Sequence, residues 1–391
     1  MRNFIKHSSL ALFCGALSTV AALAAPPVPS MTRVMVVADL SDESSDLLTV
    51  AVAGTPLQRT LGGRVAVLPM RDMHDAMRAT RTGEYDVIVG PAHVAASALV
   101  YGYELIGSTA GQTKYVLVGS PTLKSLADLK GRRAYFPGQD SLRSYVARGL
   151  LQQEGMTPRA LKQVTYGQTS GAGLITVAGG GAEATVALES EWKEWSLAHP
   201  KTGVVLATSR DMPSGVSVVV KKETPESVRR AVMQWLASPD NLIPNAGRVV
   251  AASNAAPYEY VASLGLFTPA DLTGVTRVSA KQAYEMSQKG ARLIDVRTER
   301  EYSTKHARGS VLIPYGEKSL KALDFDSKLD SFGGIAKVDN KTQPIIFFCN
   351  GAECWKSYKA SKVARESGFT SVYWLRGGMP EWTAENLPTN P

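Results

Sequence analysis

Short apolar runs alternate with helix-type spacing of apolar residues over the first two thirds of the chain. The runs that we interpret as strands lie at 33–38, 65–68, 86–89, 115–118, 133–136, 185–188, 204–206 and 216–220, and helix-type spacing is clearest at 73–81 and 142–153. Strands that alternate with helices are typical of an α/β fold with largely parallel sheets, buried on both faces. Such folds bind ligands at the carboxyl ends of strands, beside helix N-termini.

A turn-rich seam at 266–274 separates this region from a smaller pattern of the same kind. There we expect helices over 281–288 and 356–367, and strands over 291–297, 343–348 and 371–375. A chain of 391 residues is long enough to form two hydrophobic cores. We therefore predict one α/β domain over 31–265 and a second, smaller α/β domain with a parallel sheet over 275–391.

The beginning of the chain is typical of a secretory signal. Arg2 and Lys6 precede an almost wholly apolar stretch over 10–23, and Ala22-Leu23-Ala24 has the small residues that a signal peptidase requires. The stretch is too short to span a membrane comfortably. We predict a signal peptide over 1–24 and export to the periplasm, which leaves Cys349 and Cys354 as the cysteines of the mature chain.

The formal net charge of +8 is spread along the chain, without a dense run of lysine and arginine among aromatic residues. Nucleic acid is therefore not an expected partner. We expect neither a cofactor nor a metal ion. Where predicted strands end, small polar residues lead into helices, as in Gly90-Pro91-Ala92-His93, 137–141 and 167–171.

Three segments resemble the phosphate/phosphonate-type periplasmic binding proteins: "GEYDVIVGPAHVAASAL", "LKSLADLKGRRAYFPGQDSLRSYVARGLLQQEGMTP" and "LATSRDMPSGVSVVVKKETPESVRRAV". The resemblance implies a two-lobed type II binding fold that closes over a small anionic or sulfur-containing ligand, and an ABC-type permease as a partner. Carried over by position, the ligand-binding residues are His93, Ser141, Thr169, Ser170 and Glu189.

Each of these positions also has a purely structural interpretation. His93 can brace a turn, Ser141 can cap a helix, and Glu189 can pair with a neighbouring lysine or arginine. The acidic loop at 39–43 opposes the capture of an anion unless its charges point away.

The segment "IIFFCNGAECWKS" places a cysteine directly after a buried strand. A strand that ends in cysteine, followed by a tight loop and a helix, forms an anion cradle whose field favours the thiolate. Cys349 is therefore the candidate nucleophile. The residues of this active-site loop beside the two cysteines are Asn350, Gly351, Ala352, Glu353, Trp355 and Lys356.

The second domain resembles a rhodanese domain through "RLIDVRTEREY", "HARGSVLIP" and "SGFTSVYWLRGGMPEW". The resemblance implies that Cys349 is the catalytic cysteine and that Asp295 and Arg297 support its loop. The usual rhodanese loop has the pattern Cys-x-x-Gly-x-Arg-Ser. This sequence departs from it, because Cys354 occupies the position of the cation. Related phosphatases need an arginine in a longer loop, and this loop has none.

The sequence thus predicts an exported sulfurtransferase that moves sulfane sulfur from thiosulfate or a related donor through a Cys349 persulfide. A thiol acceptor or a periplasmic reductant is the expected second partner. Cys354 is interpreted as a resolving thiol that forms a reversible disulfide with Cys349, or as half of a bridge that only shapes the loop. The alternative is a ligand-binding or sensor protein in which the cysteine loop is a redox switch without turnover.

Overall fold

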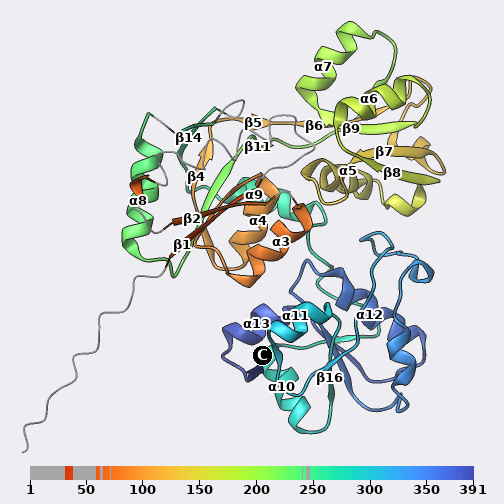
Figure 1. Cartoon of the computed structure of the whole chain (residues 1–391). Helices are drawn as coiled ribbons and strands as arrows, with labels where there is room; N and C mark the ends of the chain where they lie inside the picture. Colours follow the sequence, from red (N-terminus) through yellow and green to blue (C-terminus); the bar gives the residue numbers. More distant parts are fainter. Residues whose placement is uncertain (1–30, 38–58, 62–64, 71, 240, 244–246) are drawn as a thin grey trace, which may run out of the picture. The chain divides into compact units, whose positions relative to one another are not determined.

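Three larger sheets, each flanked by helices, organise the described part of the chain (Figure 1). The computed structural model describes residues 31–37, 59–61, 65–70, 72–239, 241–243 and 247–391, and one compact unit extends from Thr32 to Pro391. The predicted signal peptide and the acidic loop at 39–43 lie outside the described residues. Within the described ranges, every helix is too short or too polar to cross a membrane.

The first sheet has seven strands in the order β13-β14-β4-β12-β3-β1-β2. Its strands are β1 (Thr32–Val37), β2 (Val65–Met70), β3 (Val87–Gly90), β4 (Tyr103–Thr109), β12 (Ser217–Lys221), β13 (Leu242–Ile243) and β14 (Gly247–Ala251). The helices that accompany it are α3 (Met73–Thr82), α4 (Ala92–Val100), α8 (Glu226–Ala237) and α9 (Ala256–Ser263). Alternate residues of β1 and β3 enter two different cores, so both faces of the sheet are buried.

The second sheet has five strands in the order β10-β6-β9-β7-β8. Its strands are β6 (Tyr115–Gly119), β7 (Arg133–Pro137), β8 (Gln163–Gly167), β9 (Ala184–Leu188) and β10 (Val204–Thr208), with helices α5 (Leu142–Gln153), α6 (Ser170–Ala178) and α7 (Glu189–Ala198). Short 3-10 turns lie at η1 (Leu126–Leu129) and η2 (Pro158–Ala160). The chain enters this lobe after β5 (Gln112–Thr113) and leaves it before β11 (Met212–Pro213), and these two strands pair with each other.

The expectation of largely parallel sheets is wrong for the first domain. β1 pairs in parallel with β2 and β3, but β12 is antiparallel to both β3 and β4. In the second sheet, β6 is antiparallel to both of its neighbours. The error has a physical cause: helices cover both faces, so central strands such as β3, β6 and β12 are continuous apolar runs, and such a run looks the same whatever the strand direction.

The third sheet is wholly parallel and has the order β15-β20-β19-β16-β18. It consists of β15 (Thr276–Arg277), β16 (Arg292–Asp295), β18 (Val311–Leu312), β19 (Ile345–Phe348) and β20 (Val372–Leu375). The accompanying helices are α10 (Ala280–Gln288), α11 (Glu299–Thr304), α12 (Trp355–Glu366) and α13 (Gly378–Ala384). The 3-10 turns η3 (Ser327–Leu329) and η4 (Gly333–Lys337) and the antiparallel pair of β17 (His306–Ala307) and β21 (Thr389–Asn390) complete this domain.

Candidate functional site

Strand β19 positions Cys349 at the carboxyl end of the third sheet. Ile345 and Phe347 pack into one hydrophobic core, and Ile346 and Phe348 pack into the core on the opposite face. All four side chains are essentially inaccessible, which holds the strand firmly between two layers of helices. The loop 349–354 then leads directly into α12, whose first residue is Trp355.

Cys349 and Cys354 form a disulfide, with their Cα atoms 6.4 Å apart. The pairing that the sequence predicts for the resting protein is therefore present in the structure. Cys349 is fully buried, and its Sγ atom lies 3.5 Å from the hydroxyl oxygen of Ser357. Trp374 donates its indole N–H to the same oxygen at 3.0 Å, and the Ser357 hydroxyl itself donates to the Cys354 carbonyl at 3.5 Å. Neither Ser357 nor Trp374 was identified from the sequence.

Asp295 and Arg297 lie beside the start of the loop, as the rhodanese resemblance implies. Arg297 Nη2 is 2.7 Å from Asp295 Oδ2, and its Nη1 lies 3.5 Å from the side-chain oxygen of Asn350. Asn350 also donates to Glu301 at 2.5 Å. Burial alone raises the pKa of Glu301, but hydrogen bonds from Thr298 and Asn350 hold the pKa below its ordinary value.

Glu353, between the two cysteines, is buried against helices α3 and α4 of the first domain. Ser97 donates its hydroxyl to Glu353 Oε1 at 2.7 Å, and the Tyr101 hydroxyl donates to Oε2. Arg81 Nη1 lies 3.7 Å from Oε2. Burial raises the pKa of Glu353, although Arg81 and the two hydroxyls act in the opposite direction. The loop of one domain is thus fixed by side chains of the other.

Backbone groups of the loop are also bonded to the first domain and to the seam that joins the two domains. The amide of Ala352 donates to the Tyr101 hydroxyl at 3.0 Å, and its carbonyl accepts from the Thr268 amide and hydroxyl at 2.8 and 2.7 Å. Burial and the nearby Glu353 raise the pKa of Tyr101, so this hydroxyl stays neutral. In the disulfide form, the Ala352 amide is therefore already bonded to Tyr101, although the predicted anion cradle would use this amide to bind an anion.

The predicted ligand residues of the second lobe lie at helix N-termini. Ser141 caps α5, because its hydroxyl accepts from the Ser144 amide at 3.2 Å and donates to the Pro137 carbonyl at 2.8 Å. Thr169 caps α6 and accepts from the Ala172 amide at 3.3 Å. The structural interpretation of Ser141 as a helix cap is therefore correct.

Glu191, rather than Glu189, joins these residues. The hydroxyl of Ser170 donates to Glu191 Oε2 at 2.8 Å, and Arg143 Nη2 lies 2.8 Å from Oε1. Glu189 instead pairs with Lys193 at 3.1 Å on the exposed side of α7, as its structural interpretation expects. Glu191 and Arg143 were not identified from the sequence, and the buried Arg143 holds the partly exposed Glu191 carboxylate against the predicted ligand residue Ser170.

His93 lies in the first turn of α4 and is fully buried. Its ring centroid is 5.8 Å from that of Tyr145 on α5, whose hydroxyl donates to Asp140 at 3.3 Å. His93 therefore packs against α5, the helix that Ser141 caps. His93 and Ser141 both lie beside Tyr145, whose amide donates to the Ser141 carbonyl at 3.1 Å.

Asp140 accepts a hydrogen bond from Lys321 of the second domain at 2.6 Å, and His74 Nδ1 lies 3.8 Å from its other oxygen. Burial on its own raises the pKa of Asp140, yet the Lys321 charge and the hydrogen bonds hold that pKa well below its usual range. Lys321 of the second domain thus places a positive charge against Asp140, the residue directly before Ser141.

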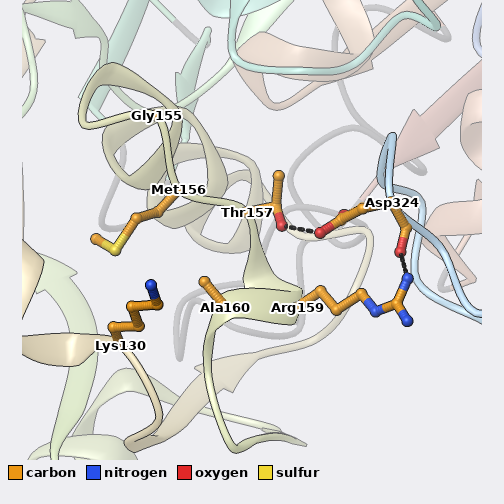
Figure 2. Close-up of a pocket in the computed structure, with 7 residues that line it drawn as sticks. All are labelled: Lys130, Gly155, Met156, Thr157, Arg159, Ala160 and Asp324. Carbon is orange, nitrogen blue, oxygen red and sulfur yellow. Dashed lines mark hydrogen bonds between the residues drawn. The ribbon is translucent and has the colours of Figure 1, made fainter.

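Figure 2 shows a hollow of about 400 Å³ where Asp324 of the second domain meets the end of α5 and η2. The Thr157 hydroxyl donates to the Asp324 carboxylate at 2.6 Å, and Arg159 donates to the Asp324 carbonyl. The lining residues are Lys130, Gly155, Met156, Thr157, Arg159, Ala160 and Asp324. Because no predicted site residue is among them, we assign no function to this hollow.

A two-lobed binding domain followed by a cysteine-loop α/β domain defines the class of this protein. Residues 40–261 match the family of ABC transporter, phosphonate, periplasmic substrate-binding proteins, and residues 279–385 match the rhodanese-like domain family. The chain belongs to the phosphonate-type periplasmic substrate-binding protein family and carries a rhodanese domain at its C-terminal end.

Sulfurtransferases are among the similar curated proteins. Thiosulfate sulfurtransferase 16, chloroplastic, from Arabidopsis thaliana is 33% identical over 116 residues, which cover 29% of this chain and 90% of that protein. Thiosulfate:glutathione sulfurtransferase from Saccharomyces cerevisiae is 30% identical over 96 residues, which cover 24% of this chain and 64% of that protein. Both similarities concern the rhodanese domain alone.

Among solved structures, PhnD1 from Prochlorococcus marinus in complex with methylphosphonate is similar to the binding domain. The identity is 16% and the TM-score is 0.45, over 61% of this chain and 98% of that one.

Proposed function

We propose that this protein is an exported sulfurtransferase that transfers sulfane sulfur through Cys349, coupled to a domain that binds a small anion. In this proposal, residues 1–24 are a signal peptide, residues 31–265 form the binding domain and residues 275–391 form the rhodanese domain. The observation that carries the proposal is the position of Cys349, the end of a buried parallel strand directly before α12, in a domain that belongs to the rhodanese family.

The reaction begins after a reductant opens the disulfide. The Cys349 thiolate attacks the outer sulfur of thiosulfate, and the sulfur–sulfur bond of thiosulfate breaks as sulfite leaves with the electron pair. The product is a Cys349 persulfide. A thiol acceptor then takes the outer sulfur and regenerates the Cys349 thiolate. Alternatively, the Cys354 thiolate attacks Cys349 Sγ, which releases hydrosulfide and restores the disulfide.

A second candidate function is a ligand sensor with a redox switch. The observation that favours it is the buried disulfide, whose loop is bonded through Glu353 to the binding domain. In that case ligand binding and the cysteine redox state influence each other, and sulfur is not turned over. A periplasmic ligand and an ABC-type permease are compatible with both candidates.

Sulfite release from thiosulfate by the reduced, full-length mature protein distinguishes the two. We expect repeated turnover with a thiol acceptor, and complete loss of turnover in Cys349→Ser. A reduced wild-type protein that forms no persulfide and releases no sulfite would overturn the sulfurtransferase proposal and leave the sensor.

A further inference from the structure

The segment between Cys349 and Cys354 has no cationic side chain, and Lys356 of the active-site loop lies beyond it, in the first turn of α12. Between Cys349 and Cys354 the side chains include one carboxylate, Glu353, and neither lysine nor arginine. An anionic sulfur donor and its leaving oxyanion need positive charge close to the attacking thiolate. If the chain turns over such a donor, the charge must come from outside this segment.

Two of the arginines around the loop are already engaged. Arg297 is bonded to Asp295 and to the Lys305 carbonyl at 2.8 Å. Arg376 donates to the Pro269 carbonyl at 2.9 Å and to the Thr268 carbonyl at 2.6 Å. Lys356 lies in the first turn of α12, close to Glu301. Its charge helps to lower the pKa of Glu301, although less than the hydrogen bonds described above do.

Arg81, in the last turn of α3, is different. Its side chain is 6% exposed, and Nε is buried without a hydrogen bond to any of the described residues. A buried guanidinium N–H is costly to leave unsatisfied, so this atom indicates a ligand that the protein alone does not provide. The aliphatic stem of Arg81 lies against the loop at Gly351, where a Cβ atom would be 3.4 Å from Arg81 Cδ.

We propose that Arg81 of the binding domain supplies the cation of the cysteine loop and binds the oxyanion of the sulfur donor. This inference rests on the proposed sulfurtransferase function and names the charged class of its donor. The site is then built from both domains, with the Tyr101 hydroxyl and the Ala352 amide beside the guanidinium.

The existing contact between Arg81 and Glu353 does not use the full hydrogen-bonding capacity of the guanidinium. It is a single approach of 3.7 Å rather than a two-bond fork, and Glu353 is already held by Ser97 and Tyr101. Burial raises the pKa of Glu353, while Arg81 and the two hydroxyls act in the opposite direction. An oxyanion at Arg81 would add the hydrogen-bond acceptor that Nε lacks.

Alkylation of Cys349 tests this charge without relying on turnover. In full-length Cys354→Ser protein, Cys349 is the remaining thiol of the mature chain, and iodoacetate and iodoacetamide alkylate it by the same displacement of iodide. The two reagents differ in charge. We expect Arg81→Met to lower the iodoacetate-to-iodoacetamide rate ratio about tenfold. Arg81→Lys should keep most of the ratio, because it retains the charge.

Arg78→Met is the matched control, since Arg78 lies on the same helix, is 34% exposed and pairs with Asp75 at 3.1 Å. In the Cys354→Ser background, the iodoacetate-to-iodoacetamide rate ratio of Arg78→Met should equal that of Cys354→Ser alone. In Arg81→Met with Cys354 intact, the KM for thiosulfate should rise about tenfold, while transfer from an uncharged organic trisulfide should change little.

An unchanged alkylation ratio in Arg81→Met overturns the inference, and so does an equal loss with both reagents. Failure of the proposed function gives a separate result: wild-type protein would not turn over thiosulfate, while the alkylation ratio would still report whether Arg81 attracts anions to Cys349.

Discussion

Lys321 Nζ lies 2.6 Å from Asp140 Oδ1, so a lysine of the rhodanese domain neutralises a carboxylate at the start of α5 in the binding domain. The two side chains are 12% and 17% exposed, which makes this a largely buried ion pair. The next residue, Ser141, is a predicted ligand residue. The ion pair therefore connects the rhodanese domain to the region where ligand binding is expected.

Replacing Lys321 alone should be strongly destabilising. Lys321→Met leaves the Asp140 carboxylate buried without its counter-charge, and we expect the free energy of unfolding to fall by about 3 kcal/mol. The double variant Lys321→Met/Asp140→Asn should recover most of that loss, because neither charge remains. Urea denaturation measures both changes. The exposed Lys318 provides the control, and a loss in Lys321→Met no larger than in Lys318→Met would refute the prediction.

Glu353 should make stability depend on pH. Burial raises its pKa in the folded state above the unfolded value of about 4.3. Its contribution is therefore fully present below that unfolded value and is lost as the pH rises through the folded pKa. Glu353→Gln keeps hydrogen-bonding groups and removes the titration, so its stability relative to wild type should increase between pH 4 and pH 7. Parallel pH curves for the two proteins would count against this prediction.

Gly378 should be indispensable to the cysteine loop. It has φ 57°, and a Cβ atom there would lie 2.2 Å from the Cys349 carbonyl oxygen. Gly378→Ala must therefore displace the loop, and we expect a loss of at least tenfold in sulfur transfer and of about 2 kcal/mol in stability. Gly309 has φ 82° with open space around it, so Gly309→Ala has similar backbone strain without the clash. Equal effects of both substitutions would mean that backbone strain causes the loss and that the clash with the Cys349 carbonyl does not contribute.

Ser141 should be needed for ligand binding by the first domain. A ligand at a hundred times its dissociation constant adds about 2.7 kcal/mol of stability, which a thermal-shift screen detects. The screen should include sulfate, thiosulfate, phosphate, phosphonates and organosulfonates. Ser141→Leu fills the helix N-terminus and should abolish the shift, whereas Thr122→Leu, at an exposed position, should keep it. A full shift in Ser141→Leu would place the ligand elsewhere.

The sequence was sufficient to predict the elements that depend on local pattern. Four apolar residues followed by cysteine located β19 and the loop, because a parallel strand covered on both faces must be apolar throughout. The start of α12 differs from the expected helix by one residue. Strand direction was mispredicted for β12, since an apolar run has no direction.

The contacts that define the site could not be predicted from the sequence, for a different reason. Arg143 and Glu191 are 48 residues apart, Asp140 and Lys321 are 181 apart, and Ser97 and Glu353 are 256 apart. Each of these residues has an ordinary role in its own helix or loop, and only the packing of lobes and domains brings the partners together. Glu353 could be assigned to the loop from sequence, but its burial against Tyr101 could not.

The disulfide should be the resting state of the exported protein, and its reduction should be required for sulfur transfer. Cys349 Sγ cannot attack a donor while it is bonded to Cys354, and an oxidising compartment keeps such a pair closed until a reductant arrives. Mass spectrometry after alkylation should therefore find no labelled cysteine in unreduced mature protein and two after reduction. Activity should appear only in the reduced sample.

Cys354→Ser separates the two roles of the pair. Without a resolving thiol, Cys349 cannot close the disulfide, so this variant should transfer sulfur from thiosulfate to a thiol acceptor without prior reduction. Its persulfide should also last longer, because Cys354 is the nearest thiol that can displace hydrosulfide from Cys349. If both thiols of unreduced wild type are alkylated, the disulfide is not the resting state. If wild type and Cys354→Ser are equally active without reductant, Cys354 has no part in the reaction.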